Sequence, residues 1–219
     1  MASSLRTLKI VLLGEGAVGK TSLVRKFVEG MYSDDYITTI GVNVKKKLLS
    51  DMSLQLIIWD IYGQKVSAER HAANYHGAKG ALMVYDSTRK STFDNISGWI
   101  SDLYKVTGEV PVIILGNKFD IIRDFEEELG VEVASTAPEQ FHDYMLKRHA
   151  GVVEYYAKAF NQPTKFEPVS LAHVLKWAGM GRNDFNRKFP YFQTSAKTGK
   201  NVEEAFTELG KTMLGGQNG

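Results

Sequence analysis

The sequence contains no cysteine among its 219 residues. Disulfide bonds and metal sites with thiolate ligands are therefore excluded, and the composition fits a reducing setting such as the cytosol. Prenyl and palmitoyl groups attach to cysteine, and the start Met1-Ala2-Ser3-Ser4 lacks the second-position glycine that myristoylation requires. We therefore expect no lipid anchor in this chain.

Long apolar runs and a large excess of charge of one sign are also missing. No stretch of the sequence approaches the roughly 18 to 20 apolar residues of a membrane-spanning helix, and no signal peptide opens the chain. The net charge of +2 is too small to argue for nucleic acid or an anionic membrane as the main partner, and we expect no nucleic-acid partner. We expect a cytoplasmic protein that is peripheral to a membrane only through a partner or a missing tail.

A glycine-rich segment follows the apolar run 8–13. It reads Gly14-Glu15-Gly16-Ala17-Val18-Gly19-Lys20-Thr21-Ser22, which has the spacing of a phosphate-binding P-loop. Glycines let successive N–H groups point inward, and the helix that follows adds the positive end of its dipole. Lys20 is expected to reach the terminal phosphates, and the Thr21 hydroxyl to bind Mg²⁺. A nucleotide is therefore the expected ligand.

Apolar strands alternate with helices along the rest of the chain. We predict strands over 8–13, 42–50, 54–60, 81–86, 110–116 and 191–194, and helices over 20–29, 91–105 and 201–214. This alternation predicts one α/β domain over 1–219, with a mostly parallel six-stranded sheet and helices on both faces. Ligands of such sheets bind at the carboxyl ends of the strands, where the polar motifs of this chain fall.

Two short motifs follow the last two predicted strands. Asn117-Lys118-Phe119-Asp120 comes after 110–116, and Ser195-Ala196-Lys197 comes after 191–194. A carboxylate at Asp120 can accept two parallel hydrogen bonds from guanine, whereas adenine offers a mismatched edge. Polar pairing of this kind rejects the wrong partner by about 10⁴ to 10⁵. The motifs therefore favour GTP over ATP, and an ATP-using P-loop kinase is the least favoured alternative.

The ordered set of motifs resembles the small GTPases of the Ras superfamily, and most closely the Rab branch. The set comprises the P-loop, Thr39-Ile40-Gly41, Asp60-x-x-Gly63-Gln64, Asn117-Lys118-x-Asp120 and Ser195-Ala196-Lys197. Segments such as Trp59-Asp60 and Val84-Tyr85-Asp86 are similar to Rab segments, and the likeness covers all but roughly 121–189. The resemblance implies the P-loop G-domain fold, GTP/GDP and Mg²⁺ as cofactors, and a molecular switch in membrane traffic or related signalling.

The resemblance also implies the roles of the reacting groups. Thr39 would bind Mg²⁺ only when the γ-phosphate is present, and Asp60 would hold the ion through water. Gly63 would offer its N–H to the γ-phosphate, and Gln64 would orient the attacking water while Lys20 contacts the phosphates. Hydrolysis is expected to be slow without an activating partner. Effectors, exchange factors and activating proteins are expected as partners, but the sequence does not identify them.

The residues around the base follow from the same resemblance. Asn117 would brace the loops, the stem of Lys118 would cover one face of the base, and the N–H of Ala196 would meet the guanine oxygen. Tyr32 would lie on the sugar side. Tyr36, Asp120, Ser195 and Lys197 complete the expected nucleotide-binding set.

The second switch segment departs from the family pattern. It reads Asp60-Ile61-Tyr62-Gly63-Gln64-Lys65, where relatives usually have Asp-Thr-Ala-Gly-Gln-Glu. Tyr62 replaces a small residue near the γ-phosphate, and Lys65 reverses a charge that helps nucleotide exchange in relatives. The alternative to a working switch is therefore a nucleotide-binding scaffold held in one state, with impaired hydrolysis or exchange.

The segment 121–189 is longer than relatives need between these motifs, so we predict an enlarged helical insertion. Thr136-Ala137-Pro138-Glu139 has the pattern of a capping box, followed by apolar residues at helical spacing up to Pro163. A further helix over 169–178 would carry Leu171, Val174, Leu175 and Ala178 on one stripe. The stripe indicates a core contact, and the alternative is a lid or partner platform beside the guanine pocket.

Overall fold

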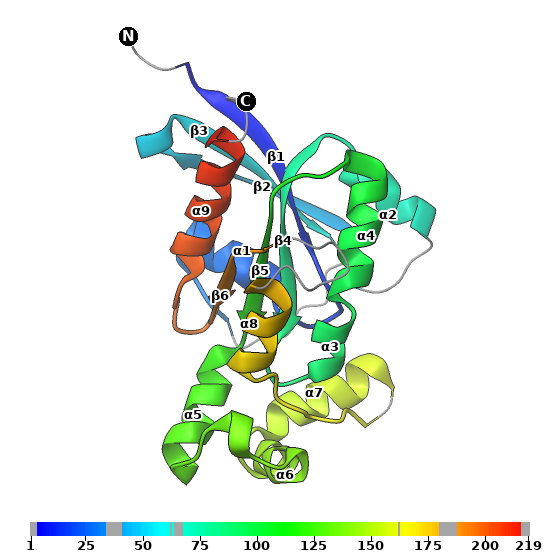
Figure 1. Ribbon diagram of the computed structural model, residues 1–219, viewed down its shortest axis with the longest axis vertical. Helices are drawn as coiled ribbons and strands as arrows, with labels where there is room; N and C mark the ends of the chain where they lie inside the picture. Colours follow the sequence, from blue (N-terminus) through cyan, green and yellow to red (C-terminus); the bar gives the residue numbers. More distant parts are fainter. Residues whose placement is uncertain are drawn as a thin grey trace.

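The fold is built on a single mostly parallel sheet (Figure 1). The structure, a computed structural model, describes residues 4–33, 41–61, 63, 68–161, 163–179 and 188–215, with only the backbone of 68–71. Within these ranges six strands pair in the order β2-β3-β1-β4-β5-β6. β2 is antiparallel to β3, and the other pairs are parallel, as predicted. The strands are β1 (Arg6–Leu13), β2 (Val42–Leu49), β3 (Leu54–Ile61), β4 (Ala78–Asp86), β5 (Val112–Asn117) and β6 (Tyr191–Gln193).

The helices alternate with the strands along the chain, and most of them cover the two faces of the sheet. They are α1 (Lys20–Glu29), α2 (Ala68–Tyr75), α3 (Lys90–Asp94), α4 (Ile96–Thr107), α5 (Phe119–Leu129), α6 (Pro138–Arg148), α7 (Ala150–Phe160), α8 (Leu171–Gly179) and α9 (Val202–Gly215). The predictions for α1 and α9 are confirmed. The helix predicted over 91–105 is two helices, because the N–H of Asn95 bonds to the Phe93 carbonyl and interrupts the regular helical pattern there.

Alternate residues of β1 face two different hydrophobic clusters. Ile10 and Leu12 pack in a cluster with residues of α1 and α9, whereas Val11 and Leu13 pack in a second cluster with residues of α2, α3, α4 and α8. A strand with helices on both faces must be apolar at successive positions, which explains the continuous run in the sequence. None of the helices within the described ranges is long and apolar enough to cross a membrane.

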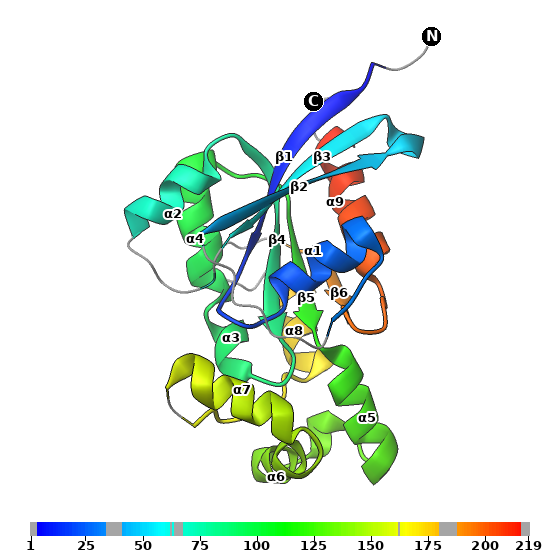
Figure 2. The ribbon, with the colours of Figure 1, turned by 180° about the vertical axis from the view of Figure 1, so that it is seen from behind.

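A third hydrophobic cluster lies outside the two faces of the sheet. Helices α5, α6 and α7 gather at one end of the molecule in Figure 1 and again in Figure 2, on the side of the P-loop. Their shared core is rich in aromatic residues, and the partly buried Ala17 of the P-loop packs against it. The buried members are Ile121, Ile122, Phe125, Val133, Phe141, Tyr144, Met145, Tyr156 and Phe166.

The helices of this region differ in detail from the prediction. α6 begins at Pro138 with Ala137 as its N-cap and without a side-chain cap, because the Thr136 hydroxyl donates to the Glu132 carbonyl at 2.9 Å instead. The predicted capping box is therefore wrong. The chain also turns at His149 (φ −125°, ψ 41°), which separates α6 from α7 within what the sequence predicts as one helical stretch.

The stripe predicted on α8 is only half buried. Val174 and Ala178 are buried, whereas Leu171 and Leu175 are 43% and 48% exposed. The chain before α8 is held by backbone hydrogen bonds, because the Glu167 N–H donates to the Thr88 carbonyl and the Val169 N–H to the Ser87 carbonyl, both at 2.9 Å. These bonds continue the pairing beyond the carboxyl end of β4 and fix the helical region to the sheet.

Candidate functional site

The P-loop connects β1 to α1 at the carboxyl end of the sheet. Its backbone takes positive φ at Gly14 (134°), Ala17 (60°) and Gly19 (96°). A Cβ at Gly14 would lie 2.0 Å from the Val84 carbonyl oxygen, and one at Gly19 would lie 2.3 Å from Asn117 Nδ2. These two positions therefore require glycine, both for the backbone conformation and for the close approach of β4 and β5.

Side chains from several elements turn the P-loop carbonyls outward. Lys20 Nζ donates to the Gly14 and Glu15 carbonyls, each at 2.8 Å; Arg89 donates to Gly16, Lys118 to Ala17 and Asn117 to Val18, each at 2.9 Å. Because C=O and the next N–H point in opposite directions across a trans peptide, the N–H groups of 15–19 face away from these donors. The amides of the loop are thus available to an anion.

Lys20 is buried at the start of α1, beside Gly63. A Cβ at Gly63 would lie 2.3 Å from Lys20 Nζ and 2.4 Å from the Glu15 carbonyl oxygen, so only glycine allows this approach. Burial lowers the pKa of the Lys20 ammonium to about 8, although the negative charges of Asp60 and Glu15 oppose the shift. A polyphosphate beside Lys20 would restore the full charge of the ammonium.

Thr21 and Asp60 form a second polar pair at the phosphate side. The Thr21 hydroxyl donates to Asp60 Oδ2 at 2.6 Å, while Asp60 Oδ1 is buried and has no hydrogen-bond partner among the described residues. Burial raises the pKa of Asp60, opposed by the Thr21 hydrogen bond and the charge of Lys20. A hydroxyl beside a carboxylate with an unused oxygen is a donor set that suits Mg²⁺, which prefers oxygen ligands and retains water.

The two guanine motifs meet at the ends of β5 and β6. Asn117 joins them to the P-loop, because its Oδ1 accepts the Ala196 N–H at 3.2 Å while its Nδ2 bonds to Val18. The Ser195 hydroxyl donates to Asp120 Oδ1 at 2.7 Å, which orients that carboxylate. The Ala196 N–H is predicted to donate to the guanine oxygen. In the structure it donates to Asn117 Oδ1, so the base would have to share this donor with Asn117.

The remaining predicted residues are placed only in part. Ser22 lies in the first turn of α1 and is partly buried, Lys197 is exposed, and Tyr32 packs against the cluster formed with α1 and α9. Tyr36, Thr39, Tyr62, Gln64 and Lys65 lie outside the described residues.

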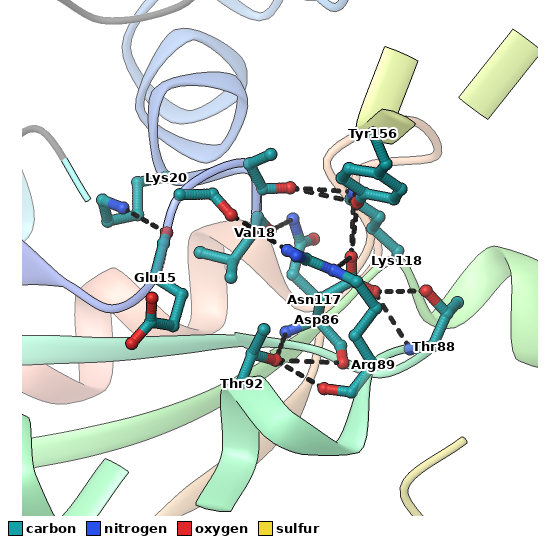
Figure 3. A network of polar contacts seen from close by, with 12 residues as sticks. Glu15, Val18, Lys20, Asp86, Thr88, Arg89, Thr92, Asn117, Lys118 and Tyr156 are labelled. Atoms are coloured by element: carbon teal, nitrogen blue, oxygen red, sulfur yellow. Dashed lines mark hydrogen bonds and ion pairs between the residues drawn. The ribbon is translucent and has the colours of Figure 1, made fainter. Parts of the chain in front are cut away.

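Three residues at the site were missed by the sequence reasoning: Asp86, Arg89 and Tyr156 (Figure 3). Asp86 Oδ2 lies 3.0 Å from both Arg89 Nε and Lys118 Nζ, and the Tyr156 hydroxyl donates to it at 2.5 Å. Burial raises the pKa of Asp86, but Lys118, Arg89 and the hydrogen bonds from Tyr156 and Thr88 outweigh it and hold the pKa well below its ordinary value. The sequence signal that could have identified Asp86 was its position as an acidic residue at the carboxyl end of a buried strand.

Comparisons with known proteins agree with this geometry. A sequence profile of the Ras family matches residues 9–165. The chain is 30% identical over 209 residues to mouse Ras-related protein Rab-21, covering 94% of this chain and 72% of the relative. It is equally similar to Theileria annulata Ras-related protein Rab-1, with 94% and 73% covered, and 28% identical to human Ras-related protein Rab-26, with 94% and 63% covered.

The family profile covers the P-loop and Asn117-Lys118-x-Asp120, the alignment with Rab-21 spans 94% of the chain, and the mostly parallel sheet has the arrangement expected of a Ras-like G-domain. Family membership implies a guanine nucleotide as ligand, and regulators and effectors as partners. The chain therefore belongs to the Ras family and is a Rab-like small GTPase, which binds GTP and GDP with Mg²⁺, hydrolyses GTP and acts as a GTP/GDP switch in membrane traffic.

Proposed function

We propose that the P-loop and the two guanine motifs of this chain form the nucleotide site of the switch. The amides of Glu15, Gly16, Ala17, Val18 and Gly19 bind the phosphates, together with Lys20 and the first turn of α1 at Thr21 and Ser22. The observation that carries the proposal is the set of five consecutive P-loop carbonyls held by side chains, since it leaves the amides of the loop to the phosphates.

The base lies against Lys118 in this proposal, with Tyr32 on the sugar side, and Tyr36 also belongs to the nucleotide-binding set. Asp120 accepts two hydrogen bonds from guanine, with Ser195 holding the carboxylate and Ala196 and Lys197 closing the edge of the pocket. The short contact between Ser195 and Asp120 supports this assignment, because it orients the carboxylate while each of its two oxygens keeps a lone pair for the ligand.

Thr21, Asp60 and Thr39 are the residues that would hold Mg²⁺, which supplies neutralisation of the phosphate charge when it is bound. In the GTP state, Gly63 donates its N–H to the γ-phosphate and Gln64 orients the attacking water. Lys20 stabilises the charge on the phosphates. Loss of the γ-phosphate removes the contacts of Thr39 and Gly63, so the loops that carry them change position and alter the surface offered to effectors.

We infer that residues 1–219 form one G-domain in which about 121–189 are an enlarged helical insertion. The packing of α5, α6 and α7 beside the P-loop and the backbone bonds from 167–169 to 87–88 support a single unit. We also infer that the protein works in the cytoplasm, at a membrane surface that it reaches through a partner or through further chain. Fractionation of cells expressing the tagged protein tests the location.

The decisive test of the site uses the purified protein. The nucleotide released on denaturation should be GDP or GTP, and Asp120→Asn should lower GDP affinity by at least about 100-fold while raising affinity for xanthosine diphosphate. The reason is that the new amide N–H faces the additional carbonyl of xanthine. Absence of measurable GDP or GTP binding with Mg²⁺ would contradict the proposal.

Single-turnover phosphate release, compared with Tyr62→Ala, separates a cycling switch from a static scaffold.

A further inference from the structure

Tyr156 lies deep in the helical region but directs its hydroxyl at the nucleotide site. It is fully buried (0% exposed) on α7, and its ring packs in the aromatic cluster at 5.7 Å from Phe166 and 6.0 Å from Phe160, centroid to centroid. The hydroxyl contacts Lys118 Nζ and lies 2.5 Å from Asp86 Oδ2 and 3.2 Å from the Ala17 carbonyl oxygen (Figure 3).

The hydroxyl proton has one favourable place. A phenol has a single proton, and Asp86 Oδ2 is both the nearer and the charged acceptor, so Tyr156 donates there. The Ala17 carbonyl accepts instead from Lys118 at 2.9 Å, and the Tyr156 oxygen accepts from the same ammonium. Lys118 is thereby fixed by three acceptors: the Ala17 carbonyl, the Tyr156 hydroxyl and Asp86.

The ring of Tyr156 is linked to the P-loop through Arg89. The Arg89 guanidinium lies over the ring with its Cζ 4.3 Å from the centroid, and the same guanidinium donates to the Gly16 carbonyl at 2.9 Å. Cations over an aromatic face are attracted by its quadrupole. Tyr156 thus contacts both Arg89, which donates to the Gly16 carbonyl, and Lys118, which donates to the Ala17 carbonyl.

We propose that Tyr156 is a positioning residue for nucleotide retention, which acts by orienting Lys118 and the Gly16-Ala17 part of the P-loop and does not touch the nucleotide itself. The inference rests on the proposed function of Lys118 at the base. A phenylalanine would fill the same volume in the aromatic cluster, so a purely structural role gives no reason for a hydroxyl among buried ions. The helical insertion is in this way part of the nucleotide site.

The test measures GDP dissociation with a fluorescent analogue in the presence of Mg²⁺. Tyr156→Phe keeps the ring over Arg89 and removes the hydroxyl, so it should accelerate dissociation by about three- to tenfold, which is part of the roughly 10- to 100-fold effect of a hydrogen bond to charged groups because Tyr156 acts through Lys118. Tyr144→Phe is the matched control, because it removes a hydroxyl from the same aromatic cluster at a position outside the network; its dissociation rate should match that of the native protein. Thermal unfolding checks that both variants fold.

A double-mutant cycle with Lys118→Met identifies the route of the effect. Lys118→Met should itself accelerate dissociation, and Tyr156→Phe should add less than about twofold in that background, because the group that it positions is gone. Equal acceleration in both backgrounds, no effect of Tyr156→Phe, or an equal effect of Tyr144→Phe would overturn the inference and leave the proposed site intact. Native dissociation in Lys118→Met would instead contradict the proposed site.

Discussion

Asn117 Nδ2 donates to the Val18 carbonyl at 2.9 Å, and this bond joins the end of β5 directly to the P-loop. The same side chain accepts the Ala196 N–H through Oδ1 at 3.2 Å, so one amide group links three loops of the site. Both partners are buried backbone groups that would lose a hydrogen bond without it.

Replacement of Asn117 should therefore release nucleotide. We expect Asn117→Ala to accelerate GDP dissociation by about 10- to 100-fold, because two buried hydrogen bonds are lost at about 1 kcal/mol or more each. Asn95→Ala is the control, since Asn95 donates to the Glu15 carboxylate at an exposed position, and it should change the rate by less than about twofold. Similar effects of the two variants would mean that the link through Asn117 does not matter for retention.

Nucleotide binding should take up a proton at alkaline pH. Burial lowers the pKa of Lys20 to about 8, so at pH 8.5 this side chain is neutral in most molecules of the nucleotide-free protein. The charge of the phosphates raises the pKa of Lys20, so the side chain is protonated again when nucleotide binds. The bound state therefore holds more protons than the free state, and nucleotide affinity falls as the pH rises above about 8. Calorimetry in buffers of different ionisation enthalpy should report this uptake at pH 8.5 and a much smaller one at pH 7.

Lys20→Arg provides the reference for that experiment, because a guanidinium stays charged throughout the range. The variant should bind nucleotide without the alkaline uptake. If the native protein and Lys20→Arg exchange the same number of protons, the proton does not belong to Lys20.

The pair of Thr21 and Asp60 should control the dependence on Mg²⁺. Asp60→Asn and Thr21→Ala should each raise the Mg²⁺ concentration needed to slow GDP release by at least about tenfold, because each removes an oxygen ligand or its orienting partner. Asp51→Asn, which removes an exposed carboxylate from the turn after β2, should leave the Mg²⁺ titration unchanged.

The same titration should depend on pH in a direction set by Asp60. Burial raises the pKa of this carboxyl, so protons compete with the metal at a higher pH than for an exposed aspartate. Affinity for Mg²⁺ should thus fall as the pH decreases toward the folded-state pKa of Asp60. An affinity that stays constant down to pH 4 would contradict this assignment.

The aromatic cluster should be essential to the stability of the whole domain. Phe141 is fully buried and contacts the Phe125 ring edge to face at 4.9 Å, so Phe141→Ala should lower the free energy of unfolding by about 3 to 5 kcal/mol in urea titrations. Leu146→Ala, on the same helix but 46% exposed, should cost less than about 1 kcal/mol.

The same titrations test whether the insertion belongs to one domain. The three tryptophans, Trp59 on β3, Trp99 on α4 and Trp177 on α8, all belong to the hydrophobic cluster on one face of the sheet, while far-UV circular dichroism reports all helices, including α5 to α7. Coincident transitions by fluorescence and circular dichroism are expected for one cooperative unit. A separate early transition in circular dichroism alone would mean that α5 to α7 unfold independently.

Local patterns were sufficient for the elements whose ends carry strong signals. α1 ends at Glu29 before Gly30, which takes φ 71° as a C-cap glycine, and the apolar runs of β1, β3, β4 and β5 are typical of buried strands. The breaks at Asn95 and His149 could not be predicted in this way, because helical spacing of apolar residues continues across both positions. Likewise, the exposed Leu171 and Leu175 follow the same spacing as the buried Val174 and Ala178, so only the packing of α8 distinguishes them.

The sequence by itself determined the P-loop, the guanine motifs and the mostly parallel sheet, because each depends on residues close together in the chain. The P-loop depends on glycines at positive φ, the Asp120 motif on an acidic residue after a strand, and the strands of the sheet on continuous apolar runs. Only the tertiary structure decided that Tyr156 of α7 meets Asp86 and Lys118. It also decided that five P-loop carbonyls are held by side chains from several elements. Contacts between residues so far apart in the chain depend on how helices pack, which no local pattern encodes.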